Sequence, residues 1–164
     1  MSASGGISGR RVAVVVGVFV LASAAIAGLW FLRSPGAVRL RVDDRAVVAK
    51  GQDVYARECA SCHGARLEGQ PNWRQPGADG RLPAPPHDAS GHTWHHPDEL
   101  LFRLVKYGTA KVANMPNYQS AMPIYEGRLS DDDILAALSY IKSQWPKDVR
   151  VRHDELNRAA AQSR

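Results

Sequence analysis

Apolar residues recur every three to four positions in three stretches of the chain, at residues 47–59, 97–108 and 130–144. This spacing is the period of an α-helix that buries one face against the rest of a protein. No stretch reads clearly as a strand, and no segment is repeated along the chain. The pattern therefore predicts an all-α fold built from a few amphipathic helices.

The ends of two of these helices are marked in the sequence. Pro97 suits the first turn of the second helix, and Gly108 suits its end. Ser130 and Asp133 form the capping-box pattern that opens the third helix, and Pro146 stops it. These signals predict the limits of both helices to within a residue or two.

Two features point to close packing and to something held inside the fold. Gly51 stands within the first predicted helix, where glycine costs about 1 kcal/mol relative to alanine. Such a residue suits a place where another backbone crosses closely. Residues 64–96 have no period and are rich in proline. A loop of that length is acceptable when a bound cofactor gives it a surface to pack on.

The N-terminal part has a different pattern. Arg10 and Arg11 precede about 20 uncharged residues, 12–32, enough for a helix to span the roughly 30 Å core of a bilayer. The run is either a transmembrane anchor with its N-terminus inside, or a secretory signal peptide cleaved near the A-x-A pattern at 25–27. It continues past that pattern, which favours the anchor.

The chain thus divides into four segments. Residues 1–33 are the membrane anchor or signal peptide, and residues 34–45 are a short linker. Residues 46–146 form one domain, since about 100 residues is an ordinary domain size. Residues 147–164 are charged and rich in alanine, and we expect them to be a polar C-terminal tail, as a frayed helix or without regular structure.

The formal net charge of +5 is modest for a chain of 164 residues. It can steer the docking of an acidic protein partner, but an ordinary solvated surface carries a similar charge. No basic cluster interleaved with aromatic residues occurs, so we expect no nucleic-acid partner.

The residues that carry chemistry are Cys59-Ala60-Ser61-Cys62-His63, a C-x-x-C-H motif typical of covalent haem attachment. Each cysteine thiol adds across one vinyl group of the haem, and the histidine that follows can bind the iron. Because such attachment takes place outside the cytoplasm, we expect an exported protein. Both cysteines of the chain lie in this motif, so no disulfide framework is available.

Other interpretations of the two cysteines are a redox dithiol, a strained disulfide or a zinc site. A redox dithiol would suit a βαβ context, whereas the surroundings here are helical. A zinc site would need four ligands, with His92, His95 and His96 joining the cysteines. Haem attachment explains more of the motif, because it alone needs a histidine directly after the second cysteine.

Over residues 47–145 the chain resembles a class I c-type cytochrome. The resemblance rests on the C-x-x-C-H motif after a first helix, on Met122-Pro123, and on the capped last helix with Tyr140. It implies the cytochrome c fold, in which three to five helices wrap around one covalently bound haem c. It also implies that the first and last helices cross where Gly51 lets Tyr140 approach.

The same resemblance implies the iron ligands. His63 is the proximal ligand, and a methionine thioether is the sixth. Met122 lies just ahead of the last helix, where the ligand loop of the family ends, and Met115 is the alternative. A proline carbonyl after the haem motif accepts the Nδ1–H of the proximal histidine, and Pro85 is the candidate.

A histidine-rich stretch at 88–96 departs from the plainest pattern of the family. It could hold a second metal or a distal ligand, but structural roles are favoured. His96 suits a helix N-cap, and Trp94 suits a place at the haem edge or a hydrogen bond to a propionate. His87 and His153 are expected on the surface.

These features predict a mono-haem carrier of single electrons, with no catalytic residue of its own. We expect a single-pass protein of the bacterial inner membrane with its haem domain in the periplasm, serving redox protein partners of a respiratory chain. Two alternatives stay open. The chain could be the haem subunit of a larger oxidase or dehydrogenase, or a haem enzyme or sensor with an open sixth position.

Overall fold

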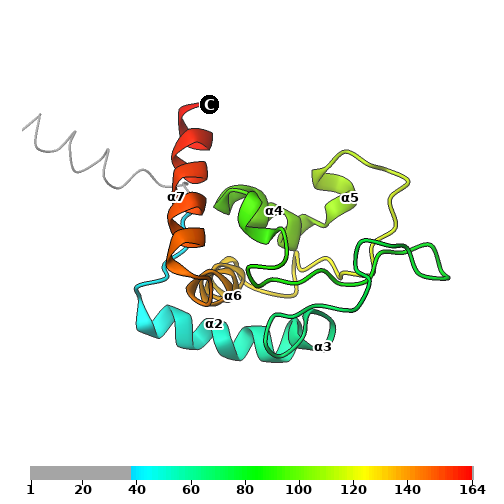
Figure 1. Ribbon diagram of the computed structural model, residues 1–164, viewed down its shortest axis with the longest axis horizontal. Coiled ribbons are helices and arrows are strands. Elements are labelled where there is room, and N and C mark those ends of the chain that lie inside the picture. The colour runs from blue at the N-terminus through cyan, green and yellow to red at the C-terminus, as the bar shows by residue number, and fades with distance from the viewer. Residues whose placement is uncertain (1–37, 164) are drawn as a thin grey trace, which may run out of the picture. The chain divides into compact units, whose positions relative to one another are not determined.

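The computed structural model describes residues 38–163, and all of its regular elements are helical (Figure 1). The proposed membrane anchor, residues 1–33, lies outside the described residues. Within the described part, no helix is long and apolar enough to cross a bilayer, and no strand is present. The elements are α2 (Arg45–Glu58), α3 (Ala60–His63), the 3₁₀ helix η1 (Thr93–His95), α4 (Asp98–Tyr107), α5 (Thr109–Val112), α6 (Asp131–Ser143) and α7 (Lys147–Gln162).

The three periodic stretches correspond to α2, α4 and α6, and their predicted end signals are confirmed. Pro97 precedes the first residue of α4, and Gly108 ends that helix with a positive φ of 84°. At α6 the Ser130 side chain accepts from the backbone N–H of Asp133, while Asp133 bonds back to the backbone N–H of Ser130. The caps satisfy backbone groups that a free helix end leaves unpaired.

The close crossing at Gly51 is confirmed, and it joins α2 to α6 (Figure 1). A Cβ atom on Gly51 would collide with the backbone carbonyl of Ala136 and would lie 2.9 Å from Cβ of Tyr140. Next to this contact the rings of Tyr55 and Tyr140 lie 5.5 Å apart, centroid to centroid. Glycine is therefore required here for space, and not for its backbone angles.

The apolar faces of α2, α4 and α6 meet in one core. Its largest members include Tyr55 from α2, Leu101 and Phe102 from α4, and Ile134 and Leu138 from α6, all buried. Cys59, Trp94 and Met122 are among the half-buried residues that pack on this core. The core thus lies directly beside the residues that the motif singled out.

The segment predicted as a polar tail is instead a 16-residue helix, α7, packed against the domain. Val149 and His153 are buried on its inner face, and His153 is 0% exposed. The prediction that His153 is a surface residue is therefore wrong. The apolar signal was weak because a histidine takes one of the buried positions and charged residues dominate the rest.

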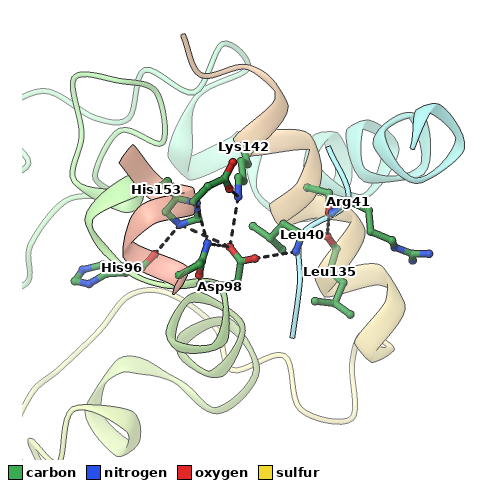
Figure 2. A network of polar contacts seen from close by, with 10 residues as sticks. Leu40, Arg41, His96, Asp98, Leu135, Lys142 and His153 are labelled. Atoms are coloured by element: carbon green, nitrogen blue, oxygen red, sulfur yellow. Dashed lines mark hydrogen bonds and ion pairs between the residues drawn. The ribbon is translucent and has the colours of Figure 1, made fainter. Parts of the chain in front are cut away.

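A buried polar cluster holds α7 in place (Figure 2). Nε2 of His153 lies 2.8 Å from the carbonyl oxygen of His96 and 3.7 Å from a carboxylate oxygen of Asp98. The Lys142 ammonium, buried to 4% exposure, lies 2.6 Å from Asp154 and 3.9 Å from Asp98. Charges this deep are tolerated because each has partners of opposite sign or hydrogen-bonding groups.

Asp98 also joins α7 to the segment at Leu40 and Arg41 that precedes α2. Its backbone N–H donates to the side-chain oxygen of Asn157 on α7, at 2.8 Å. Its other carboxylate oxygen accepts the backbone N–H of Leu40 at 2.9 Å (Figure 2). The neighbouring N–H of Arg41 donates to the hydroxyl of Ser139 on α6. The segment that leads into the domain is therefore bound to α4 and α6 before α2 begins.

We predict that Gly51→Ala lowers the free energy of unfolding by about 1–3 kcal/mol, because the added methyl group forces α2 and α6 apart. Denaturant unfolding of the haem-loaded protein measures the change. Gln52→Ala, an exposed position on the same helix, is the control and should change stability by less than about 0.5 kcal/mol. Equal stability of Gly51→Ala and the parent would show that the crossing is looser than described.

We predict that His153 makes the domain sensitive to acid. Burial first, and then the nearby Lys142 ammonium, lower the pKa of His153 below its ordinary value. The unfolded chain binds a proton on this ring near pH 6.5, whereas the folded protein does so only at lower pH. The unfolded state therefore holds more protons just below pH 6.5, and stability falls as the pH drops through that range.

Unfolding titrations between about pH 7.5 and 5 test this expectation, with a slope of up to about 1.4 kcal/mol per pH unit from one proton. His153→Gln should flatten the slope. Val149→Ala is the matched control, since it weakens the packing of α7 and removes no titratable group. A slope unchanged in His153→Gln would contradict the prediction.

Candidate functional site

The C-x-x-C-H motif forms the corner where α2 ends. The backbone N–H of Cys59 donates to the carbonyl of Tyr55 at 2.9 Å, and that of His63 donates to the carbonyl of Cys59 at 2.9 Å. This turn brings both cysteines and His63 into one short helical unit, α3 with its cap. Both thiols are free, with Cys59 half-buried and Cys62 exposed. The structure holds no disulfide between these two cysteines.

Burial, with smaller effects from Glu58 and Cys62, raises the pKa of the Cys59 thiol to about 11. Redox-active and metal-binding cysteines are thiolates, and their sites lower the pKa of the thiol. The surroundings of Cys59 do the opposite, so this thiol stays protonated at neutral pH. The surroundings of Cys59 therefore lack the features of a reactive redox thiol.

His63 is buried, and one of its ring nitrogens already has a partner. Its Nδ1 lies 2.8 Å from the carbonyl oxygen of Pro85, the acceptor that the resemblance implied. A carbonyl only accepts, so the proton resides on Nδ1 and the lone pair of Nε2 is left to bind a metal. Burial lowers the pKa of His63, while the bond to Pro85 acts in the opposite sense. The neutral ring could therefore serve as a metal ligand through Nε2.

The loop after the motif folds back to place Pro85. The N–H of Gly69 donates to the carbonyl of His63 at 2.8 Å, and that of His87 donates to the carbonyl of Leu67 at 2.8 Å. Just beyond the end of α6, the indole N–H of Trp145 donates to the carbonyl of His87 at 2.7 Å. Pro85 is therefore held by bonds on both sides, which explains how a long proline-rich loop can be ordered.

His87 was predicted on the surface, but its ring lies against the ring of His63. The rings of His63 and His87 are stacked, with centroids 4.0 Å apart and planes 21° from parallel. Nδ1 of His87 lies 2.8 Å from the hydroxyl of Thr93. Burial and the neighbouring His63 and His92 lower the pKa of His87 well below its ordinary value. No periodic or motif signal marks this residue in the sequence.

The two candidate methionines differ in their surroundings. Met122 is half-buried and packs on the core, as Cys59 does, whereas the Met115 side chain is 47% exposed. The loop of Met122 is tied to the motif by Tyr125, a buried residue whose hydroxyl donates to the carbonyl of Glu58 at 2.7 Å. Sequence reasoning missed Tyr125. The structure thus favours Met122 as the methionine that belongs to the site.

The histidine-rich stretch has structural contacts. His92 stacks on Trp73 and His95 stacks on Trp94, with ring centroids 5.3 and 3.7 Å apart. The indole N–H of Trp94 donates to the carbonyl of Ala89 and so already has a partner within the chain. His96 is not the N-cap of α4, a position taken by Pro97. Among residues 38–163, no group of three or more His, Cys, Asp and Glu side chains is placed to hold a metal ion.

The donor set fits a covalently attached haem. The turn supplies two free thiols three positions apart, and a neutral imidazole with its Nε2 lone pair available. Cys59 and the thioether-bearing Met122 both pack against the same apolar core. Covalent attachment needs the thiols, and iron needs the imidazole and a soft second ligand. Each of these requirements is met by residues of this chain.

Comparison with known proteins agrees with this geometry. No curated protein and no solved structure matches the chain. The family model described as cytochrome c matches residues 48–145, which include most of α2, all of α3 to α6 and both candidate methionines. The chain therefore belongs to the cytochrome c family of haem-based electron carriers, whose members bind covalently attached haem c with its iron.

Proposed function

We propose that the chain is a mono-haem electron carrier whose haem is attached through Cys59 and Cys62 and ligated by His63 and Met122. The observation that carries this proposal is the bond between Nδ1 of His63 and the carbonyl of Pro85. It sets the tautomer and direction of the ring before any metal binds, as second-shell partners of metal-bound histidines do.

The cysteines would form two thioethers. Each S–H would add across one vinyl C=C, with the sulfur bonding one carbon and the proton going to the other, so no oxidant would be required. The protonated state of the Cys59 thiol is compatible with this addition. Attachment at two neighbouring points of the turn prevents the loss of the cofactor.

When bound, the haem supplies a one-electron couple, and a methionine ligand raises its reduction potential. With His63 on one side and Met122 on the other, no position would be open for substrate. Function would then be limited to accepting an electron from one protein and passing it to another, without acid–base or nucleophilic work by the chain.

The proposal extends to location and partners. Residues 12–32 are uncharged and long enough to anchor the domain, and covalent haem attachment takes place after export. The domain would then work on the periplasmic side of a bacterial inner membrane, between redox proteins of a respiratory chain.

We predict that Met122→Ala opens the sixth position. The parent should have a low-spin c-type spectrum that carbon monoxide leaves unchanged in the reduced protein. The variant should bind carbon monoxide at neutral pH. Met115→Ala is the matched control, because its side chain is largely exposed, and it should behave as the parent does.

Each other outcome has a meaning. Carbon monoxide binding by Met115→Ala and not by Met122→Ala would make Met115 the ligand. Carbon monoxide binding by the parent would favour an enzyme or sensor with an open site. Absence of covalent haem after export through an active maturation system would contradict the whole proposal.

We predict that the full chain, expressed with a c-type maturation system, remains in the inner-membrane fraction until detergent is added. Covalent haem allows the protein to be followed on a denaturing gel. A chain with residues 1–33 replaced by a cleavable export signal should appear in the soluble periplasm. Release of the unmodified chain at a reduced mass would identify residues 1–33 as a signal peptide.

A further inference from the structure

The stacked pair of imidazoles is a feature that the proposed ligand set does not use. A hydrogen bond from Nδ1 of His63 to Pro85 fixes one atom of the ring. The ring can still tilt about the line of that bond. His87 lies flat against its face, with ring centroids 4.0 Å apart, and blocks the tilt. One contact thus directs the proximal ring, and the other sets its plane.

The backbone of His87 is itself fixed from two directions. Its N–H donates to the carbonyl of Leu67 at 2.8 Å, and its carbonyl accepts the indole N–H of Trp145 at 2.7 Å. Trp145 is buried at the end of α6. The position of His87 is therefore set by the same helix that crosses α2, and does not depend on the loop alone.

Its side chain is held by a short chain of hydrogen bonds. The hydroxyl of Thr93 lies 2.8 Å from Nδ1 of His87 and donates to the carbonyl of Pro86 at 3.4 Å. With the Thr93 hydroxyl proton directed to Pro86, the Nδ1–H tautomer of His87 is the one that would donate to the Thr93 oxygen. Thr93 is buried, with 6% exposure. A leucine would fill similar volume at position 87 without needing this partner.

We propose that His87, held by Thr93, is a positioning residue that sets the plane of the His63 ring and lowers the reduction potential of the bound haem. This inference rests on the proposed ligation of iron by His63. The protein controls a haem through the groups around its axial ligands and through the polarity of their surroundings. A polar ring against the ligand stabilises the extra positive charge of the oxidised state more than an aliphatic side chain does.

The test is the midpoint potential of the purified, haem-loaded protein, with the hyperfine-shifted proton resonances of the oxidised form as a second readout. Those resonances depend on the plane of the axial imidazole. His87→Leu should raise the potential and change the resonance pattern, while its reduced form still does not bind carbon monoxide. A potential and pattern equal to those of the parent would overturn the proposal.

Thr93 supplies a matched pair that leaves His87 in place. Thr93→Val keeps the shape of the side chain and removes the hydroxyl, so it should shift the potential in the same direction as His87→Leu, by less. Thr93→Ser keeps the hydroxyl and should match the parent. Equal shifts in both variants would assign the effect to packing and refute the role of the hydrogen bond.

If His87→Leu does not acquire its haem, the two Thr93 variants test the proposal by themselves. A shift in Thr93→Val alone would support the proposal, and no shift in either variant would overturn it. Failure of the proposed function is recognised separately. In that case the parent itself would lack a low-spin c-type spectrum, or would keep it unchanged in His63→Ala.

Discussion

The contact between the backbones of α2 and α6 at Gly51 is the constraint on which the rest of the structure depends. Two helices come this close only where one of them lacks a side chain. The far end of α2 carries Cys59, and the far end of α6 carries Trp145, which bonds the carbonyl of His87. The crossing thereby connects the turn that holds His63 to the loop that presents Pro85.

Around the site, buried polar side chains are satisfied by main-chain carbonyls and not by charges. This holds for His63, Tyr55, Tyr125 and Trp145, whose partners are the carbonyls of Pro85, Gly64, Glu58 and His87. Such bonds remove the penalty of burying a donor without adding a charge near the cofactor. Uncharged, low-dielectric surroundings favour the reduced state of a haem, so the same bonds that build the site also bear on its potential.

Charged groups are buried where α7 and the segment at Leu40 converge on Asp98. Both of these segments lie outside the part of the chain that matches the family, residues 48–145. A buried cluster of Asp98, Lys142 and His153 requires all its members at once, because an unpaired charge there is costly. α7 and the segment at Leu40 are therefore each held against the domain by specific partners.

The sequence by itself determined the three main helices, their caps, the close approach at Gly51 and the motif at Cys59–His63. The helices, their end signals and the motif depend on residues within a few positions of one another, so their spacing can be read directly. The glycine within a helix indicated a close approach, and the resemblance supplied its partner on the last helix. The resemblance to the family implied that the carbonyl of Pro85 accepts a hydrogen bond from Nδ1 of His63, and the structure has this bond. Which methionine binds iron stays a prediction, although the burial of Met122 favours it.

Only the tertiary structure decided the packing of α7, the burial of His153 and the stacking of His87 on His63. The partners concerned are far apart in the chain: Leu40 and Asp98, His87 and Trp145, and His96 and His153 are separated by 57 or 58 positions. A histidine or an aspartate has no intrinsic preference for the interior. It is buried only where the fold supplies a hydrogen-bonding partner, and that supply is fixed by the crossing of the helices.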